Sequence, residues 1–124
     1  MQEEAALLKA LAEPTRLRLA VLLARAGETC VCRLAEALEA PDFKISRHLA
    51  ILRAAGIVAA RRQGTWMHYK LREPCTRLEA CLQECFQTCL ADDETGKADR
   101  ERLRRAACAG AEGDPAARSE RHDA

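Results

Sequence analysis

The sequence is poor in aromatic residues: its 124 residues include one Trp, one Tyr and two Phe. So few rings disfavour a site that holds a large flat ligand by stacking. The chain also lacks a long apolar run and a positively charged leader, because Lys9, Arg16 and Arg18 interrupt the apolar residues near its start. We therefore expect no membrane span, no secretory signal and a cytoplasmic location.

Acidic residues are missing from one segment, since residues 43–72 contain no Asp or Glu. The formal net charge of the whole chain is only +1, which by itself does not indicate a nucleic-acid partner. The basic residues of the segment are Lys44, Arg47, Arg53, Arg61, Arg62, Lys70 and Arg72. Together they produce a local positive field that favours a polyanion such as DNA.

Cysteine is abundant, with seven residues in the chain. In a reducing compartment thiols act as small apolar side chains, metal ligands or redox groups. A cysteine nucleophile also needs a His and a carboxylate partner. The three His residues are His48, His68 and His122, and two of them fall in the basic segment. We therefore predict that the chain is not an enzyme.

Apolar periodicity predicts a mainly α-helical chain with one small β-hairpin. Helices are expected over residues 7–11, 14–25, 29–38 and 43–55, with Leu7, Leu8 and Leu11 as the apolar stripe of the first. Thr29 is the expected N-cap of the third helix, and Gly56 ends the fourth. The hairpin is expected over 57–71 with its turn at Gln63-Gly64.

A long helix is expected to open at Glu73-Pro74 and to carry an apolar seam suited to a partner helix. The seam consists of Leu78, Cys81, Leu82, Cys85, Phe86, Cys89 and Leu90. A break over 92–96 precedes a last helix that runs to about residue 109. We assign residues 1–109 to one DNA-binding and dimerisation domain and residues 110–124, which contain Gly113 and Pro115, to a disordered tail.

Two helices joined by a short turn, the second rich in exposed polar residues, are typical of a helix-turn-helix that binds DNA. The hairpin that follows would form a wing against the DNA backbone or in a minor groove. His48 has an alternative role, which is to brace the turn. The predicted DNA-binding residues are Lys44, Ser46, Arg47 and His48 on the helix and Arg61 and Arg62 on the wing.

Four stretches, residues 11–18, 29–35, 44–56 and 62–71, resemble in sequence and order the ArsR/SmtB family of winged-helix metal-sensing repressors. The resemblance extends from about Leu7 to Leu71. It implies a homodimer that binds an inverted-repeat DNA operator and leaves the operator when its effector binds.

Cys30 and Cys32 lie at the start of the helix before the candidate recognition helix. Soft sulfur selects soft ions, and a helix N-terminus favours the thiolate. Residues i and i+2 point about 200° apart on a regular helix, so we predict that ion capture unwinds the first turn and shifts the recognition helix. The setting Cys-Val-Cys-X-Leu resembles the subgroup of the family that senses trivalent arsenic and antimony.

The third ligand that arsenic(III) or antimony(III) prefers is left open, because Ala35 stands where some arsenic sensors have a further cysteine. The candidates are Cys75, Cys81, Cys85, Cys89, Cys108, or a water, hydroxide or small thiol. The three seam cysteines are interpreted as packing at a dimer interface, with a separate soft-metal site as the alternative.

Two alternative effectors stay open. A cadmium- or lead-responsive repressor of the same family fits the thiols, although residues 1–28 contain no Cys for an N-terminal ligand. A thiol redox sensor that binds DNA also fits. A zinc, cobalt or nickel site is disfavoured, because the long helix after the hairpin has no His.

Overall fold

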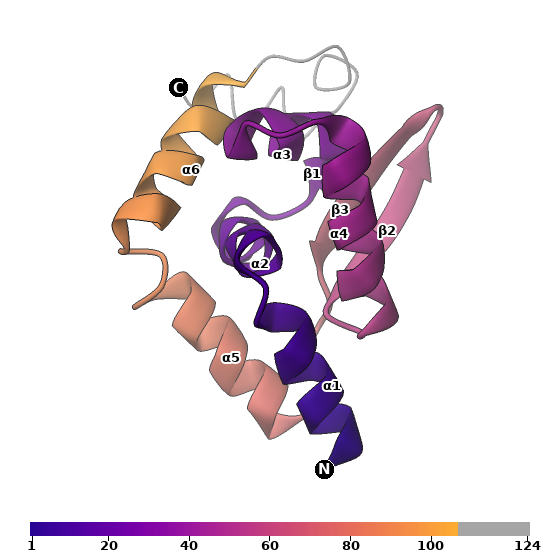
Figure 1. Cartoon of the computed structure of the whole chain (residues 1–124), viewed down its shortest axis with the longest axis vertical. Helices are drawn as coiled ribbons and strands as arrows, with labels where there is room; N and C mark the ends of the chain where they lie inside the picture. The colour runs from indigo at the N-terminus through magenta and orange to yellow at the C-terminus, as the bar shows by residue number, and fades with distance from the viewer. Residues whose placement is uncertain (107–124) are drawn as a thin grey trace.

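The computed structural model describes residues 1–106 of the chain. Its elements are α1 (Gln2–Leu11), α2 (Pro14–Ala26), β1 (Thr29–Cys30), α3 (Val31–Leu38), α4 (Asp42–Ala54), β2 (Val58–Gln63), β3 (Trp66–Leu71), α5 (Arg77–Gln87) and α6 (Glu94–Arg105). Helix α2 lies in the middle of the other helices, and the hairpin lies beside α4 (Figure 1). The predicted tail 110–124 and Cys108 lie outside the described residues.

Local capping signals set several boundaries where the sequence predicts them. Helix α2 begins at Pro14, and the Glu13 carboxylate caps it by accepting the Arg16 backbone N–H at 3.0 Å. Gly27 ends α2 with φ 77°, and Gly56 follows α4 with φ 80°, a region that favours glycine. The predicted helices over 14–25 and 43–55 are therefore confirmed, as is the hairpin.

The expected role of Thr29 as a helix N-cap is wrong. Thr29 and Cys30 instead form β1, an edge strand that pairs antiparallel with β3 in the order β1-β3-β2. The Thr29 hydroxyl donates to the Gly27 carbonyl at 2.8 Å, so it is not used for capping. Helix α3 consequently begins at Val31, and Cys30 is its N-cap.

Three other expectations need correction. Leu8 is 46% exposed and does not join Leu7 and Leu11 in the core. Helix α5 begins at Arg77 rather than at Pro74, because the Thr76 hydroxyl accepts the Glu79 N–H and caps the helix there. The break predicted over 92–96 lies earlier, over residues 88–93, because α5 ends at Gln87 and the Asp93 carboxylate caps α6, which brings Gly96 inside that helix.

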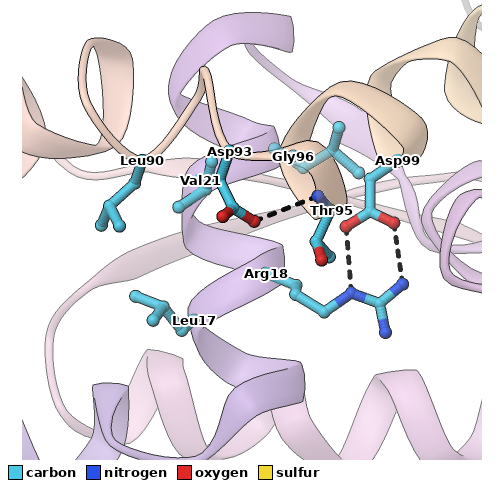
Figure 2. Close-up of a pocket in the computed structure, with 9 residues that line it drawn as sticks. Leu17, Arg18, Val21, Leu90, Asp93, Thr95, Gly96 and Asp99 are labelled. Atoms are coloured by element: carbon cyan, nitrogen blue, oxygen red, sulfur yellow. Dashed lines mark hydrogen bonds and ion pairs between the residues drawn. The ribbon is translucent and has the colours of Figure 1, made fainter.

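A buried carboxylate fixes α6 on the central helix. Asp99 is 1% exposed and accepts two hydrogen bonds from Arg18 of α2, at 3.0 and 2.7 Å, beside a small cavity of about 70 Å³ (Figure 2). These bonds raise the pKa of Arg18. Arg102 also donates to Asp99, at 2.7 Å, and to the Ala37 carbonyl of α3 at 2.6 Å. The cluster therefore joins α2, α3 and α6.

Among residues 1–106, none of the helices has both the length and the apolar character needed to cross a membrane.

Gly96 packs so closely on the preceding turn that we expect Gly96→Ala to destabilise the protein. An added Cβ would lie 2.9 Å from the Leu90 carbonyl oxygen and 3.1 Å from that of Ala91. Overpacking of this kind costs about 1–3 kcal/mol, whereas Gly→Ala in an open helix stabilises by about 0.5–1 kcal/mol. Urea unfolding measures the sign, with the exposed neighbour Lys97→Ala as the control. A gain in stability would contradict the close packing.

Candidate thiol site and nucleic-acid interface

The two sulfurs of Cys30 and Cys32 converge at the junction between β1 and α3. Cys30 has extended backbone angles, φ −67° and ψ 143°, whereas Cys32 lies in the first turn of the helix. Their Sγ atoms are 3.3 Å apart, and the two residues are 0% and 5% exposed. The expectation that the side chains point apart is therefore wrong, because only Cys32 is helical. Capture of one ion by both sulfurs does not require the first turn to unwind.

The separation of the sulfurs fits a single thiophilic ion. With metal–sulfur bonds of about 2.3 Å, the length of a zinc–thiolate bond, two sulfurs on one ion lie roughly 3.3–3.8 Å apart for bond angles between about 90° and about 109°. The observed 3.3 Å falls at the pyramidal end of this range. Cys32 is part of a disulfide. Binding by the pair therefore needs Cys32 in its reduced form.

The described residues do not supply a third ligand beside this pair. Within residues 1–106, no three His, Cys, Asp or Glu side chains lie close enough together to hold a metal ion. Cys75, Cys81, Cys85 and Cys89 are free and exposed, and none of them completes the site. The remaining candidates are an exogenous ligand and Cys108, which lies outside the described residues.

The apolar seam predicted for one long helix is divided, because α5 ends at Gln87 and the last two seam residues, Cys89 and Leu90, lie in the turn after it. Phe86 is buried, and Leu82 and Leu90 pack partly against the core of the same chain. The three seam cysteines are exposed, and the Cys89 thiol donates to the Cys85 carbonyl at 3.7 Å. Loss of solvation, and then the nearby Cys89 thiol, raise the pKa of Cys85. Packing of the seam cysteines in a dimer stays a prediction.

Helix α4 presents the predicted DNA-binding residues on the side away from the core. Lys44 and Arg47 are exposed and Ser46 is half-buried. His48 is also half-buried, and its Nδ1 lies 3.4 Å from the Arg16 guanidinium and 3.7 Å from the Glu13 carboxylate. His48 therefore braces α4 against the start of α2, which was the alternative role expected for it.

The two arginines of the wing are in different environments. Arg62 is exposed, whereas Arg61 donates from Nη2 and Nε to the Glu28 carboxylate at 2.6 and 3.0 Å. The Arg61 guanidinium lowers the pKa of Glu28. Sequence reasoning missed Glu28, because it is separated from the basic segment along the chain and follows no local pattern.

The strand register connects the thiol site to the wing. Cys30 on β1 is opposite His68 on β3, and His68 is opposite Arg61 on β2. Directly opposite residues of antiparallel strands project to the same face of a sheet. One cross-strand row therefore contains a sulfur of the thiol pair, a buried histidine and a wing arginine.

These elements define a class of protein: α3 and α4 are a helix-turn-helix, and β2 and β3 are its wing. Residues 13–60 match the profile of the family described as "Bacterial regulatory protein, arsR family". The chain is 34% identical to the homodimeric winged helix-turn-helix DNA-binding domain of a possible ArsR-family regulator from Mycobacterium bovis. That similarity covers 75% of this chain and 86% of that one, with a TM-score of 0.59.

Curated relatives agree with this fold. The arsenic resistance transcriptional regulator ArsR2 of Pseudomonas putida is 42% identical over 73% of this chain and 76% of its own length. The regulator ArsR1 of the same species is 57% identical, and the arsenical resistance operon repressor of Escherichia coli is 52% identical. The matches cover 51% and 52% of this chain but only 49% and 56% of those two proteins.

The chain belongs to the ArsR family of transcriptional regulators. The predicted family and the predicted fold class, mainly α-helical with a winged helix-turn-helix, are therefore confirmed. Membership of a family of DNA-binding regulators also confirms that the chain is not an enzyme.

Proposed function

We propose that this regulator is a repressor that binds an inverted-repeat operator as a homodimer and releases it when trivalent arsenic or antimony binds Cys30 and Cys32. The observation that carries the proposal is the 3.3 Å separation of two buried sulfurs at the start of the helix-turn-helix. The relatives in P. putida and E. coli are regulators of arsenic or arsenical resistance, which supports the choice of effector. The homodimeric M. bovis structure supports the assembly.

The effector binds at the junction between two parts of the DNA-binding surface, the wing and the helix-turn-helix. Cys30 belongs to β1, which is paired with the wing, and Cys32 belongs to α3, which leads into α4. An ion bonded to both sulfurs fixes the angle between the sheet and the helix-turn-helix. Because the wing and α4 must contact one DNA duplex together, a changed angle lowers DNA affinity. A coupling free energy of about 1–3 kcal/mol is typical of such linkage.

The test is a fluorescence-anisotropy titration on DNA sites that the protein selects from a random pool. Arsenite, antimonite, cadmium, lead and zinc are added separately in the presence of a phosphine reductant, which keeps Cys32 reduced without supplying a thiol. We expect arsenite and antimonite to release the DNA at concentrations at which zinc does not. Zinc that released DNA as well as arsenite would refute the proposal, and release by cadmium or lead alone would assign the site to those ions.

A redox sensor is the second candidate function, and the disulfide of Cys32 favours it. It predicts that peroxide releases the DNA in the absence of reductant and that the reductant restores binding. It also predicts that arsenite has no effect beyond that of other thiol reagents. The same anisotropy assay therefore separates the two functions.

The wing is tested by the salt dependence of DNA binding. We expect Arg62→Ala to flatten the slope of log K against log salt by about one unit, because one phosphate contact is lost. Glu28→Gln should steepen the slope by up to about one unit, because Arg61 is then released from its carboxylate and can bind a phosphate. The exposed Arg104 of α6 provides the control Arg104→Ala. An unchanged slope for Arg62→Ala would show that the wing is not part of the DNA interface.

A further inference from the structure

Phe43 is an aromatic side chain in an unusual place. It is the second residue of α4 and is 68% exposed, although burial of a phenylalanine ring normally stabilises a fold. The large exposed apolar residues among 1–106 are Met1, Leu8, Phe43 and Ile51. Two of these four lie on α4, eight residues apart, so they share one side of the helix. An exposed apolar surface on a recognition helix suggests a partner.

The position of Phe43 favours contact with base edges. Ile45, Leu49 and Leu52 bury the opposite side of α4 in the core. The N-terminal residues of a recognition helix are the ones that reach bases in the major groove. In that groove only thymine carries a methyl group, which apolar side chains recognise by direct contact.

Arg47, one helical turn after Phe43, is held by the same ring. Its guanidinium carbon lies 6.0 Å from the centre of the Phe43 ring, within the range of a cation–π interaction. An arginine restrained in this way loses less conformational entropy when it binds. Arginine pairs in bidentate fashion with the major-groove edge of guanine. The Phe43 ring therefore presents an apolar surface and also orients the Arg47 guanidinium.

We propose that Phe43 is a specificity-determining residue that contacts the 5-methyl group of a thymine in the operator and positions Arg47 on a neighbouring guanine. The proposal rests on the proposed function, since it needs α4 to bind operator DNA. It adds a base-reading role for a residue outside the basic side chains of the interface.

The experiment replaces each thymine of the selected DNA site with uracil, one at a time, which removes only the methyl group. We expect the wild-type protein to bind about fourfold more weakly at one thymine per half-site, as the loss of one buried methyl-sized group implies. Phe43→Ala should bind the thymine and uracil forms of that position equally. Phe43→Leu, which keeps an apolar contact, should retain part of the preference.

Leu8→Ala is the matched control, because Leu8 is also an exposed apolar residue but lies on α1. It should keep the wild-type thymine profile, and the melting temperatures of all three variants should equal that of the wild type. If uracil weakened wild-type binding at no thymine, or if Phe43→Ala kept the wild-type preference for thymine over uracil, this inference alone would be overturned. Failure to select any DNA site would instead end the proposed function.

Discussion

Replacing Cys30 or Cys32 with serine should raise the arsenite concentration needed for DNA release by about 100-fold or more, while DNA affinity without effector stays unchanged. Once one sulfur has bound the ion, the other binds intramolecularly, and such a second contact strengthens binding by about 10²–10⁴-fold. The serine hydroxyl is a harder ligand than the soft thiolate and does not replace it. The two sulfurs lie 3.3 Å apart, so one ion can reach both of them once Cys32 is reduced.

The arsenite response is measured by anisotropy under the phosphine reductant. Cys75→Ser and Cys81→Ser are the matched controls, because those thiols are exposed and lie away from the pair. Thermal melting checks that the buried substitutions leave the fold intact. A Cys30→Ser variant that responded like the wild type would place the effector site elsewhere in the protein.

Asp99→Ala should lower the free energy of unfolding by about 3 kcal/mol. The carboxylate is buried and accepts hydrogen bonds from both Arg18 and Arg102. Removing one partner of a buried ion pair costs about 3–5 kcal/mol, because the remaining charge loses its compensation. The side chains of Arg18 and Arg102 are 31% and 27% exposed, so water compensates them in part and the lower end of the range applies.

Glu101→Ala is the control for Asp99→Ala. Glu101 lies on the same helix, and its ion pairs with Arg104 and Arg105 are exposed. Exposed pairs contribute about 0–1 kcal/mol, so this variant should be nearly as stable as the wild type. Urea unfolding at neutral pH compares the two variants. A loss below about 1 kcal/mol for Asp99→Ala would show that α6 is held by other contacts.

The parts of the fold that could be predicted from the sequence are those that local chemistry determines. Pro14 and Gly27 mark α2, and Gly56 and Gly64 adopt positive φ at the end of α4 and in the hairpin turn. Each of these signals lies within a few residues of the boundary it sets. The order of the helices and the hairpin could therefore be predicted from the sequence, and so could the winged helix-turn-helix.

The geometry of the thiol site could not be predicted, because it depends on a pairing between distant residues. Thr29 has the composition of a helix cap, and only the approach of Tyr69, its β3 partner, makes it a strand residue. That pairing gives Cys30 its extended backbone and turns its sulfur toward Cys32. The ion pair of Glu28 with Arg61 and that of Arg18 with Asp99 also join residues far apart in the chain, and they leave no local pattern.

If Cys30 and Cys32 bind the effector as proposed, the placement of one sulfur on a strand and the other on a helix has a consequence for how the protein distinguishes ions. An ion of larger radius needs longer bonds, so it spreads the strand and the helix further than a smaller ion does. The junction thereby converts ionic radius into a displacement of the two DNA-contacting parts. Thiophilic ions are then distinguished by how far each one displaces the strand from the helix, as well as by how tightly each one binds.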